Sequence, residues 1–151
     1  MSGHMRALAG LGVALCLFGC KPAPPPAPPG NAVVTTAGIQ VGVIYTPPGP
    51  GLAKWAYEIE DKTPTGRFDR VAITTSVPCR TIAETTGAAP TMTPAAGPTK
   101  NWVAVYAPSV VKTKLTISCD AAAGGTATVD VLSTAGASVV TRASFSVLGP
   151  K

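Results

Sequence analysis

The densest group of side chains able to do chemistry is a run of carboxylates, Glu58, Glu60 and Asp61. Glu58 and Glu60 alternate with apolar residues, so in a strand they would share one face at a separation of about 7 Å. That separation suits the two carboxylates of an inverting glycosidase, and clustered oxygens suit Ca²⁺. Three basic residues lie nearby in the sequence: Lys54, Lys62 and Arg67. Because these bases can neutralise the carboxylates and no DxDxDG-type loop is present, we expect an exposed charged face.

Histidine, the most common general base, occurs once, as His4 near the N-terminus. Its position excludes Ser–His and Cys–His pairs and most zinc sites from the rest of the chain. A serine–lysine pair needs a buried lysine, but the alternation after Ser109 points Lys112 and Lys114 outward. Residues 124–126 lack the lysine and the helix of a phosphate loop. We therefore expect a protein that is not an enzyme and that holds no cofactor or metal.

From Asn31 onward, apolar and polar residues alternate with the period of half-buried strands. Seven stretches show this pattern: 39–45, 54–60, 71–77, 102–106, 111–119, 129–131 and 139–147. Segments rich in glycine and proline separate them as turns, and Pro108 divides the fourth stretch from the fifth. The pattern predicts an all-β fold over residues 31–151, an antiparallel two-sheet sandwich of about seven strands, immunoglobulin-like or transthyretin-like. A small barrel would give nearly the same pattern.

The N-terminus has the organisation of an export signal. Arg6 supplies a positive charge, and residues 7–18 form an apolar run too short to cross a bilayer as a helix. The run ends in Leu17-Phe18-Gly19-Cys20, which resembles the lipobox of bacterial lipoproteins. The resemblance implies a signal peptide over residues 1–19, cleavage before Cys20 and acylation of Cys20. The non-acidic residue that follows implies, by the same resemblance, delivery to the outer membrane of a host with two membranes.

Residues 21–30, with the sequence KPAPPPAPPG, predict a polyproline II tether directly after the lipidated cysteine. Proline fixes φ and cannot donate to a ladder, so ten such residues form a stiff spacer of roughly 30 Å. We expect residues 20–30 to hold the folded domain away from the membrane.

Two of the four cysteines remain for the folded domain, because Cys16 leaves with the signal and Cys20 carries lipid. The other two, Cys79 and Cys119, belong to an exported domain in which disulfides persist. A bond between them closes a loop of about 40 residues and stabilises the domain by roughly 4 kcal/mol in the chain-entropy model. We expect this structural disulfide, with Trp55 and Trp102 packed over it. The alternative is two separate thiols with a metal or redox role.

Residues 78–100 form the one long irregular stretch of the predicted domain. Loops of this length in a compact domain are usually functional or disordered, so the stretch is a candidate partner-binding loop. Its charged and large apolar side chains are Arg80, Ile82, Glu84, Met92 and Lys100. A passive, mobile insertion is the alternative interpretation.

The net charge of +5 comes from dispersed basic residues rather than from a stripe interleaved with aromatic side chains. We therefore expect no nucleic-acid binding. The excess positive charge favours anionic lipid or envelope polymers near the anchor, as a diffuse effect that salt screens.

Together these features predict a membrane-anchored, non-catalytic lipoprotein of the bacterial cell envelope. Its sandwich would act as a structural or adaptor module that binds another envelope protein in an assembly such as a secretion, pilus or phage-related machine. A first alternative is an inhibitor or immunity-type lipoprotein that binds its target through residues 78–100. A second alternative is a carbohydrate-binding module, which would need Trp55 or Trp102 exposed.

Overall fold

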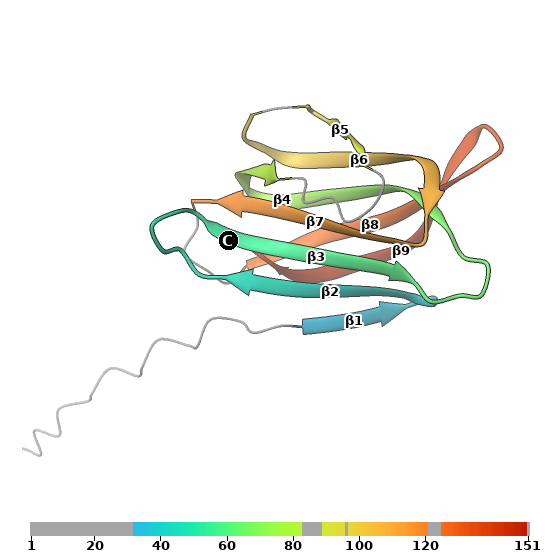
Figure 1. Cartoon of the computed structure of the whole chain (residues 1–151), viewed down its shortest axis with the longest axis horizontal. Coiled ribbons are helices and arrows are strands. Elements are labelled where there is room, and N and C mark those ends of the chain that lie inside the picture. The colour runs from blue at the N-terminus through green and yellow to red at the C-terminus, as the bar shows by residue number, and fades with distance from the viewer. Residues whose placement is uncertain (1–31, 83–88, 96, 121–124, 151) are drawn as a thin grey trace, which may run out of the picture.

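The computed structural model describes residues 32–82, 89–95, 97–120 and 125–150, and these form nine strands in antiparallel pairs (Figure 1). The strands are β1 (Ala32–Thr36), β2 (Ile39–Thr46), β3 (Ala53–Asp61), β4 (Phe68–Ile82), β5 (Thr91–Thr93), β6 (Thr99–Val110), β7 (Lys112–Cys119), β8 (Gly125–Ala135) and β9 (Ser138–Gly149). No helix that could cross a membrane occurs among the described residues. The signal peptide and tether predicted over residues 1–19 and 20–30 lie outside them.

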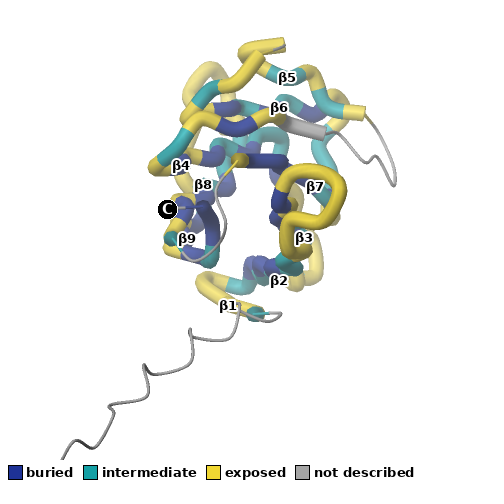
Figure 2. Tube along the Cα trace, turned by 90° about the vertical axis from the view of Figure 1, so that its left-hand side faces the viewer, coloured by how far each residue is buried: buried dark blue, intermediate teal, exposed yellow. Residues whose placement is uncertain are grey.

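Strand β4 belongs to both layers of the sandwich. Its residues 68–74 pair with β6 on one side and β8 on the other, whereas residues 79–82 pair with β7. One layer therefore contains β1, β2, β3, β7 and the end of β4. The other contains β9, β8, the start of β4, β6 and β5 (Figures 1 and 2). Pro78 lies where the β4–β6 register shifts, so its missing N–H removes no bond from that ladder.

Alternation places the core between the two layers. In β3 every second residue from Ala53 to Asp61 is buried, and β2, β7, β8 and β9 contribute in the same way. Two tyrosines link the layers: Tyr57 of β3 donates to the Leu148 carbonyl of β9 at 3.0 Å, and Tyr106 of β6 lies 2.5 Å from the Thr113 hydroxyl of β7. Burial raises the pKa of both phenols, so they stay protonated as hydrogen-bonding groups.

The predicted all-β antiparallel sandwich is confirmed, but the structure has nine strands where the pattern predicted about seven. Strand β1 was missed because it contributes nothing to the fully buried core, and β5 because it has only three residues. The predicted division of residues 102–119 into two strands is confirmed, but the break falls at Val111 rather than at Pro108, since β6 continues to Val110. This proline lies between the β4–β6 pairs at Val105 and Val110, where the register shifts and no N–H donor is needed.

The predicted disulfide is confirmed and lies within one layer. Cys79 of β4 and Cys119 of β7 are direct register partners, with their Cα atoms 4.4 Å apart, and both are buried. That spacing is typical of a non-hydrogen-bonded antiparallel pair. The bond in immunoglobulin domains joins the two sheets, whereas this one joins neighbouring strands at the point where β4 has crossed into the layer of β7.

Candidate functional site

The outer face of β3 carries Glu58 and Glu60, as the alternation predicted. Glu60 accepts a hydrogen bond from Lys62 at 2.8 Å, and its other carboxylate oxygen lies 3.7 Å from the Lys112 ammonium. The bond from Lys62 holds the pKa of Glu60 below its ordinary value, against a smaller opposing effect of burial. Glu60 therefore stays ionised and does not suit the role of a general acid.

The predicted neutralisation of this acidic run needs one correction. Of the three nearby bases, Lys62 does pair with Glu60, but Arg67 donates instead to the Ser109 carbonyl at 2.8 Å. Lys112, on the neighbouring strand, supplies the second charge. The pairing follows the register, because Glu60 and Lys112 are direct partners across β3 and β7.

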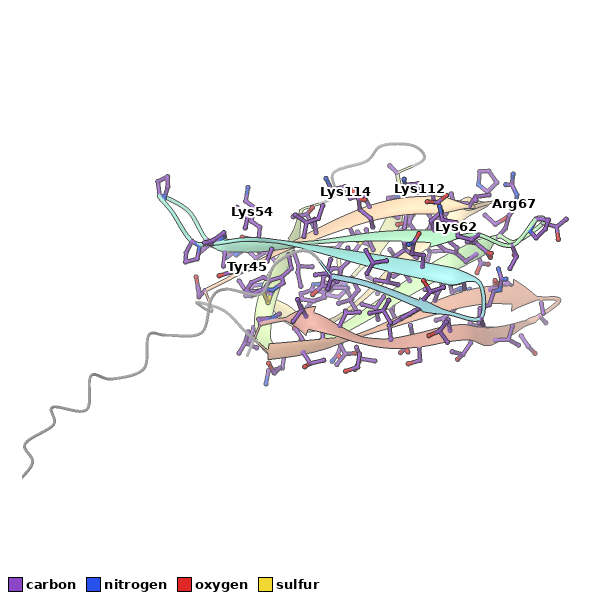
Figure 3. The ribbon with its side chains drawn as sticks, turned by 90° about the horizontal axis from the view of Figure 1, so that it is seen from below. Tyr45, Lys54, Lys62, Arg67, Lys112 and Lys114 are labelled. Atoms are coloured by element: carbon purple, nitrogen blue, oxygen red, sulfur yellow. A yellow bond between two sulfur atoms is a disulfide. The ribbon has the colours of Figure 1, made fainter. Side chains whose placement is uncertain are left out.

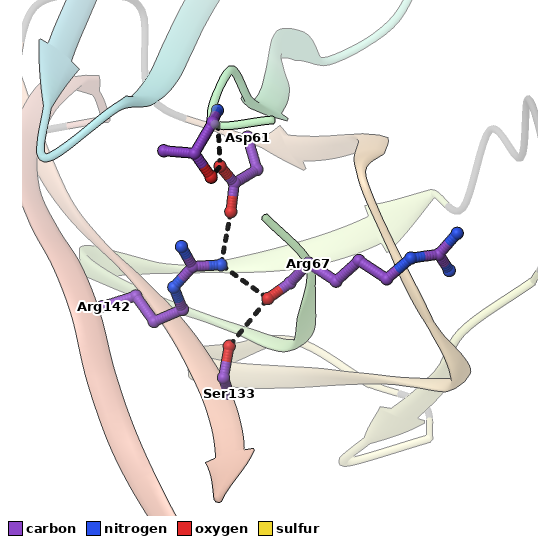
Figure 4. Close-up of polar contacts among 5 residues, drawn as sticks. Asp61, Arg67, Ser133 and Arg142 are labelled. Atoms are coloured by element: carbon purple, nitrogen blue, oxygen red, sulfur yellow. Dashed lines mark hydrogen bonds and ion pairs between the residues drawn. The ribbon is translucent and has the colours of Figure 1, made fainter. Parts of the chain in front are cut away.

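Asp61 has the opposite environment from Glu60, although it is the next residue. Its side chain is fully buried, and its Oδ1 accepts bonds from the Thr63 hydroxyl at 2.6 Å and the Thr63 amide at 3.0 Å. Its Oδ2 is bonded by Arg142 of β9 (Figure 4). Burial alone would raise the pKa of Asp61, but the bonds from Thr63 and Arg142 outweigh it and hold the pKa below its ordinary value.

The Asp61–Arg142 pair ties the two layers together at one end of the sandwich. The same Arg142 nitrogen donates to the Arg67 carbonyl at 2.5 Å, and Ser133 of β8 donates to that carbonyl at 2.9 Å. Gly66 makes the turn possible, because a Cβ there would lie 2.0 Å from Asp61 Oδ1. Both carboxylate oxygens of Asp61 and the Arg67 carbonyl accept bonds from groups of the fold, so the network joins the two layers as a structural link.

Sequence reasoning placed Asp61 in an exposed acidic run and did not single out Arg142. A signal for Asp61 was present, since it continues the buried positions 53, 55, 57 and 59. Arg142 carries no comparable signal, because it lies at a shift in the β8–β9 register, where Val131 pairs with Ala143 and Leu132 with Thr141. Such a bulge redirects a side chain in a way that period-two counting does not reveal.

Six basic residues lie on the outer surface of the β3–β7 layer or at its end, and we call this surface the basic face. It consists of Lys54, Lys62, Arg67, Arg80, Lys112 and Lys114. Figure 3 labels five of them, all except Arg80. Three described acids accompany them: Glu58, Glu60 and Asp120. The remaining described charges are three bases and three acids, so the net positive charge of the described residues lies entirely on the basic face.

The outer surface of the other layer has a different composition, and we call it the hydroxyl face. It consists of exposed Ser and Thr side chains on β4, β8 and β9: Thr74, Ser76, Thr126, Thr128, Ser144 and Ser146. Thr74, Thr128 and Ser146 are register partners and form a row across the three strands. Two charged residues, Arg70 of β4 and Asp130 of β8, share this outer surface. Asp130 accepts a bond from the Ser144 hydroxyl at 2.5 Å.

A hollow of about 200 Å³ lies on the layer of the basic face where Gly42 has no side chain. Glu58, Glu60 and Lys112 are part of its lining, together with Val33 of the edge strand. Its carboxylates are the pair considered above for glycosidase or calcium chemistry, and Glu60 is already engaged by two lysines. Groups of three or more potential metal ligands do not occur among the described residues.

The predicted partner-binding loop, residues 78–100, is partly strand. Arg80 lies exposed on β4 beside Ser118 of β7, and Lys100 lies exposed on β6, so the two bases belong to different layers. Met92 of β5 packs against the core. Ile82 ends β4, and its side chain, like all of Glu84, lies outside the described residues. The structure therefore does not gather these five residues into one described surface.

Both tryptophans are core residues, as expected. Trp55 is 0% exposed and Trp102 is 2% exposed, and they come from different layers. Trp55 packs against Tyr45 with ring centroids 5.0 Å apart. Neither indole offers a surface on which a sugar ring could stack, which removes the feature that the carbohydrate-binding alternative needs.

Comparisons with known proteins give no match: no family model matches the chain, and no curated protein or solved structure is detectably similar to it. The function is therefore inferred from the residues and their arrangement.

Proposed function

We propose that this chain is a lipid-anchored, non-catalytic adaptor of the bacterial cell envelope, whose sandwich binds another envelope protein. The observation that supports the proposal best is the difference between the two outer surfaces. A domain with a basic face on one layer and a hydroxyl face on the other presents two chemically different surfaces, which is what a module between two neighbours needs. The lipobox resemblance at Cys20 and the proline-rich residues 21–30 supply the anchor and the spacer.

The protein-binding surface of this adaptor is the hydroxyl face with the adjoining β8–β9 hairpin. Between Leu132 and Thr141 the hairpin has no charged residue, and its valines Val139 and Val140 are each 43% exposed. Interface centres are depleted in charge, and exposed aliphatic side chains beside a flat polar surface suit a protein partner. Figure 1 shows the hairpin extending beyond the rest of the layer.

Site-specific photocrosslinking in the native host tests the proposal. A photoreactive residue at Val140 or Thr128 should capture the same envelope protein, identified by mass spectrometry, in the lipidated chain. The matched control is the same residue at Ala56, on the outer face of the other layer. Equal capture at all three positions, or capture that persists unchanged in Cys20→Ser, would overturn the adaptor proposal.

The inhibitor alternative keeps one supporting observation. The Cys79–Cys119 disulfide and the β5–β6 pairs hold residues 80–90 at both ends, as a recognition loop requires. Because Met92 packs on the core, a deletion that tests this loop must spare β5. Replacing residues 83–89 by a Gly-Ser linker should abolish inhibitor activity while leaving the adaptor crosslinks at Val140 intact.

A further inference from the structure

The basic face lies on the layer through which the chain enters the domain. Strand β1, which begins at Ala32, is an edge strand of this layer and pairs with β2. Residues 20–30 precede it and are the predicted anchor and tether. The basic face is therefore attached at its own edge to the chain that leads to the membrane.

The end of the layer near the disulfide carries two of the cations, together with Asp120, which follows Cys119. Lys54 of β3 and Arg80 of β4 both pair in register with Ser118 of β7, one on each side. With strands about 4.8 Å apart, the two Cα atoms lie roughly 10 Å from each other. Both side chains are exposed, and they are near enough to share one phosphate group between them.

At the opposite end the cations alternate with carboxylates. Lys114 pairs in register with Glu58, and Lys112 and Lys62 both contact Glu60. Arg67 extends the row, with its guanidinium on a carbonyl rather than on a carboxylate. The excess of cations is thus spread along β3, a strand of nine residues or about 30 Å, rather than focused on a pocket.

From this arrangement we infer that the basic face binds the phosphate headgroups of an anionic lipid bilayer. A row of lysine and arginine that extends along β3 matches a plane of phosphates better than a single small anion, and each cation near such a surface adds to the attraction. A lipid anchor with a short tether makes this contact intramolecular, so a weak affinity suffices to hold it. The domain would then lie with the basic face against the membrane and the hydroxyl face outward.

This inference rests on the proposed function, because the anchor places the domain at a membrane. The two nevertheless make separate claims. Capture of a protein partner depends on Val140 and Thr128, whereas binding of lipid depends on residues of the other layer. An experiment without the anchor isolates the second claim.

The test uses the chain from residue 20 onward with Cys20→Ser, which contains all nine strands and has no lipid. Flotation with vesicles of phosphatidylglycerol and phosphatidylethanolamine should carry the protein at 50 mM NaCl, and 500 mM NaCl should release it. Vesicles of phosphatidylcholine alone should not bind. Lys54→Glu reverses one charge of the basic face, a change of two units, and should weaken binding roughly 25-fold, at about fivefold for each unit of charge.

Lys100→Glu is the matched control, because Lys100 is an equally exposed lysine on β6, outside the basic face. It changes the net charge by the same amount and should weaken binding less than threefold. Thermal unfolding of both variants verifies that each is folded. Equal losses for Lys54→Glu and Lys100→Glu would overturn the inference, since net charge alone would then account for binding. Tighter binding to soluble polyphosphate than to vesicles would overturn it in favour of a polymer ligand.

Discussion

The two layers of the sandwich share the same alternation but differ in what their outward positions carry. On the layer of β3 and β7, six bases and three acids occupy or border the outer surface, whereas the layer of β8 and β9 presents serine and threonine. The inward positions of both layers are mostly apolar and build one core. Only every second residue of a strand points into the core. The residues between them can therefore differ from one layer to the other according to what each outer surface binds.

The layers also differ in what holds them. The β3–β7 layer contains the disulfide, and the other layer has no covalent link of this kind among its described residues. Asp61 and Arg142 belong to neither face, because they lie between the layers and join them. Removing the disulfide or the buried Asp61–Arg142 pair therefore tests the stability of the domain. Removing a surface charge tests the binding properties of one face.

Removing the disulfide should have the largest effect on stability. Cys79→Ala combined with Cys119→Ala frees a loop closed over a separation of 40 residues, and the chain-entropy model predicts a loss of about 4 kcal/mol. Urea unfolding without reductant measures it, and the wild-type protein under reducing conditions is the control. Since β4 runs through both layers, both should unfold in one transition. Separate transitions for the two layers would contradict that coupling.

Asp61→Asn should destabilise the domain by about 3 kcal/mol, because it leaves Arg142 without its charged partner in a partly buried position. Glu60→Gln is the neighbouring control, because it removes an exposed ion pair and should change stability much less than Asp61→Asn. Urea unfolding at neutral pH gives both values. If the two variants lose the same stability, Asp61 does not act as a link between the layers.

The stabilisation by Asp61 should disappear in acid. Its pKa is lowered in the folded state, so its contribution is complete above the unfolded value of about 3.9 and is lost as pH falls through the folded pKa. The difference in Tm between the wild type and Asp61→Asn should therefore be constant from pH 6 to 8 and shrink below about pH 4. A difference that is as large at pH 3 as at pH 7 would contradict this assignment.

The variant with the smallest effect on the stability of the domain, Glu60→Gln, should also bind lipid more tightly. Glu60→Gln removes an acid from the basic face and should tighten binding to anionic vesicles about fivefold, with little change in Tm. Asp130→Asn, on the other layer, changes the net charge equally and should leave vesicle binding nearly unchanged. A similar gain for both variants would mean that the two faces do not differ in their attraction to lipid.

Much of the architecture could be predicted because each piece leaves a local trace in the sequence. The period-two pattern identified the strands of the core, and the two cysteines left for a domain expected to be exported identified the disulfide. The two missed strands lacked that trace. Strand β1 has mostly exposed residues, and β5 is too short to show a period. β1 is held by its pairing with β2, and β5 by its pairing with β6. The sequence of a single strand does not reveal which strand it pairs with.

The polar features were harder to predict because they depend on register. That Lys112 rather than Lys54 pairs with Glu60 follows from the alignment of β3 with β7. The bond from Arg142 to Asp61 spans 81 residues and depends on a bulge in β9. The basic face could be predicted only with the assignment of strands to the two layers, because its members are dispersed between residues 54 and 114. No spacing along the chain reveals which side of a sandwich they share.

Strand β1 gives the domain a mechanical property. Tension from a membrane anchor would enter at Ala32, at the first of five β1–β2 pairs, and would open them one after another instead of shearing them together. None of the five residues of β1 is fully buried, so detachment would leave the core intact. It would release about 17 Å of additional chain before the β2–β3 pairs had to open. The edge strand would thus act as an extensible joint that protects the sandwich when the anchor and the bound partner move apart.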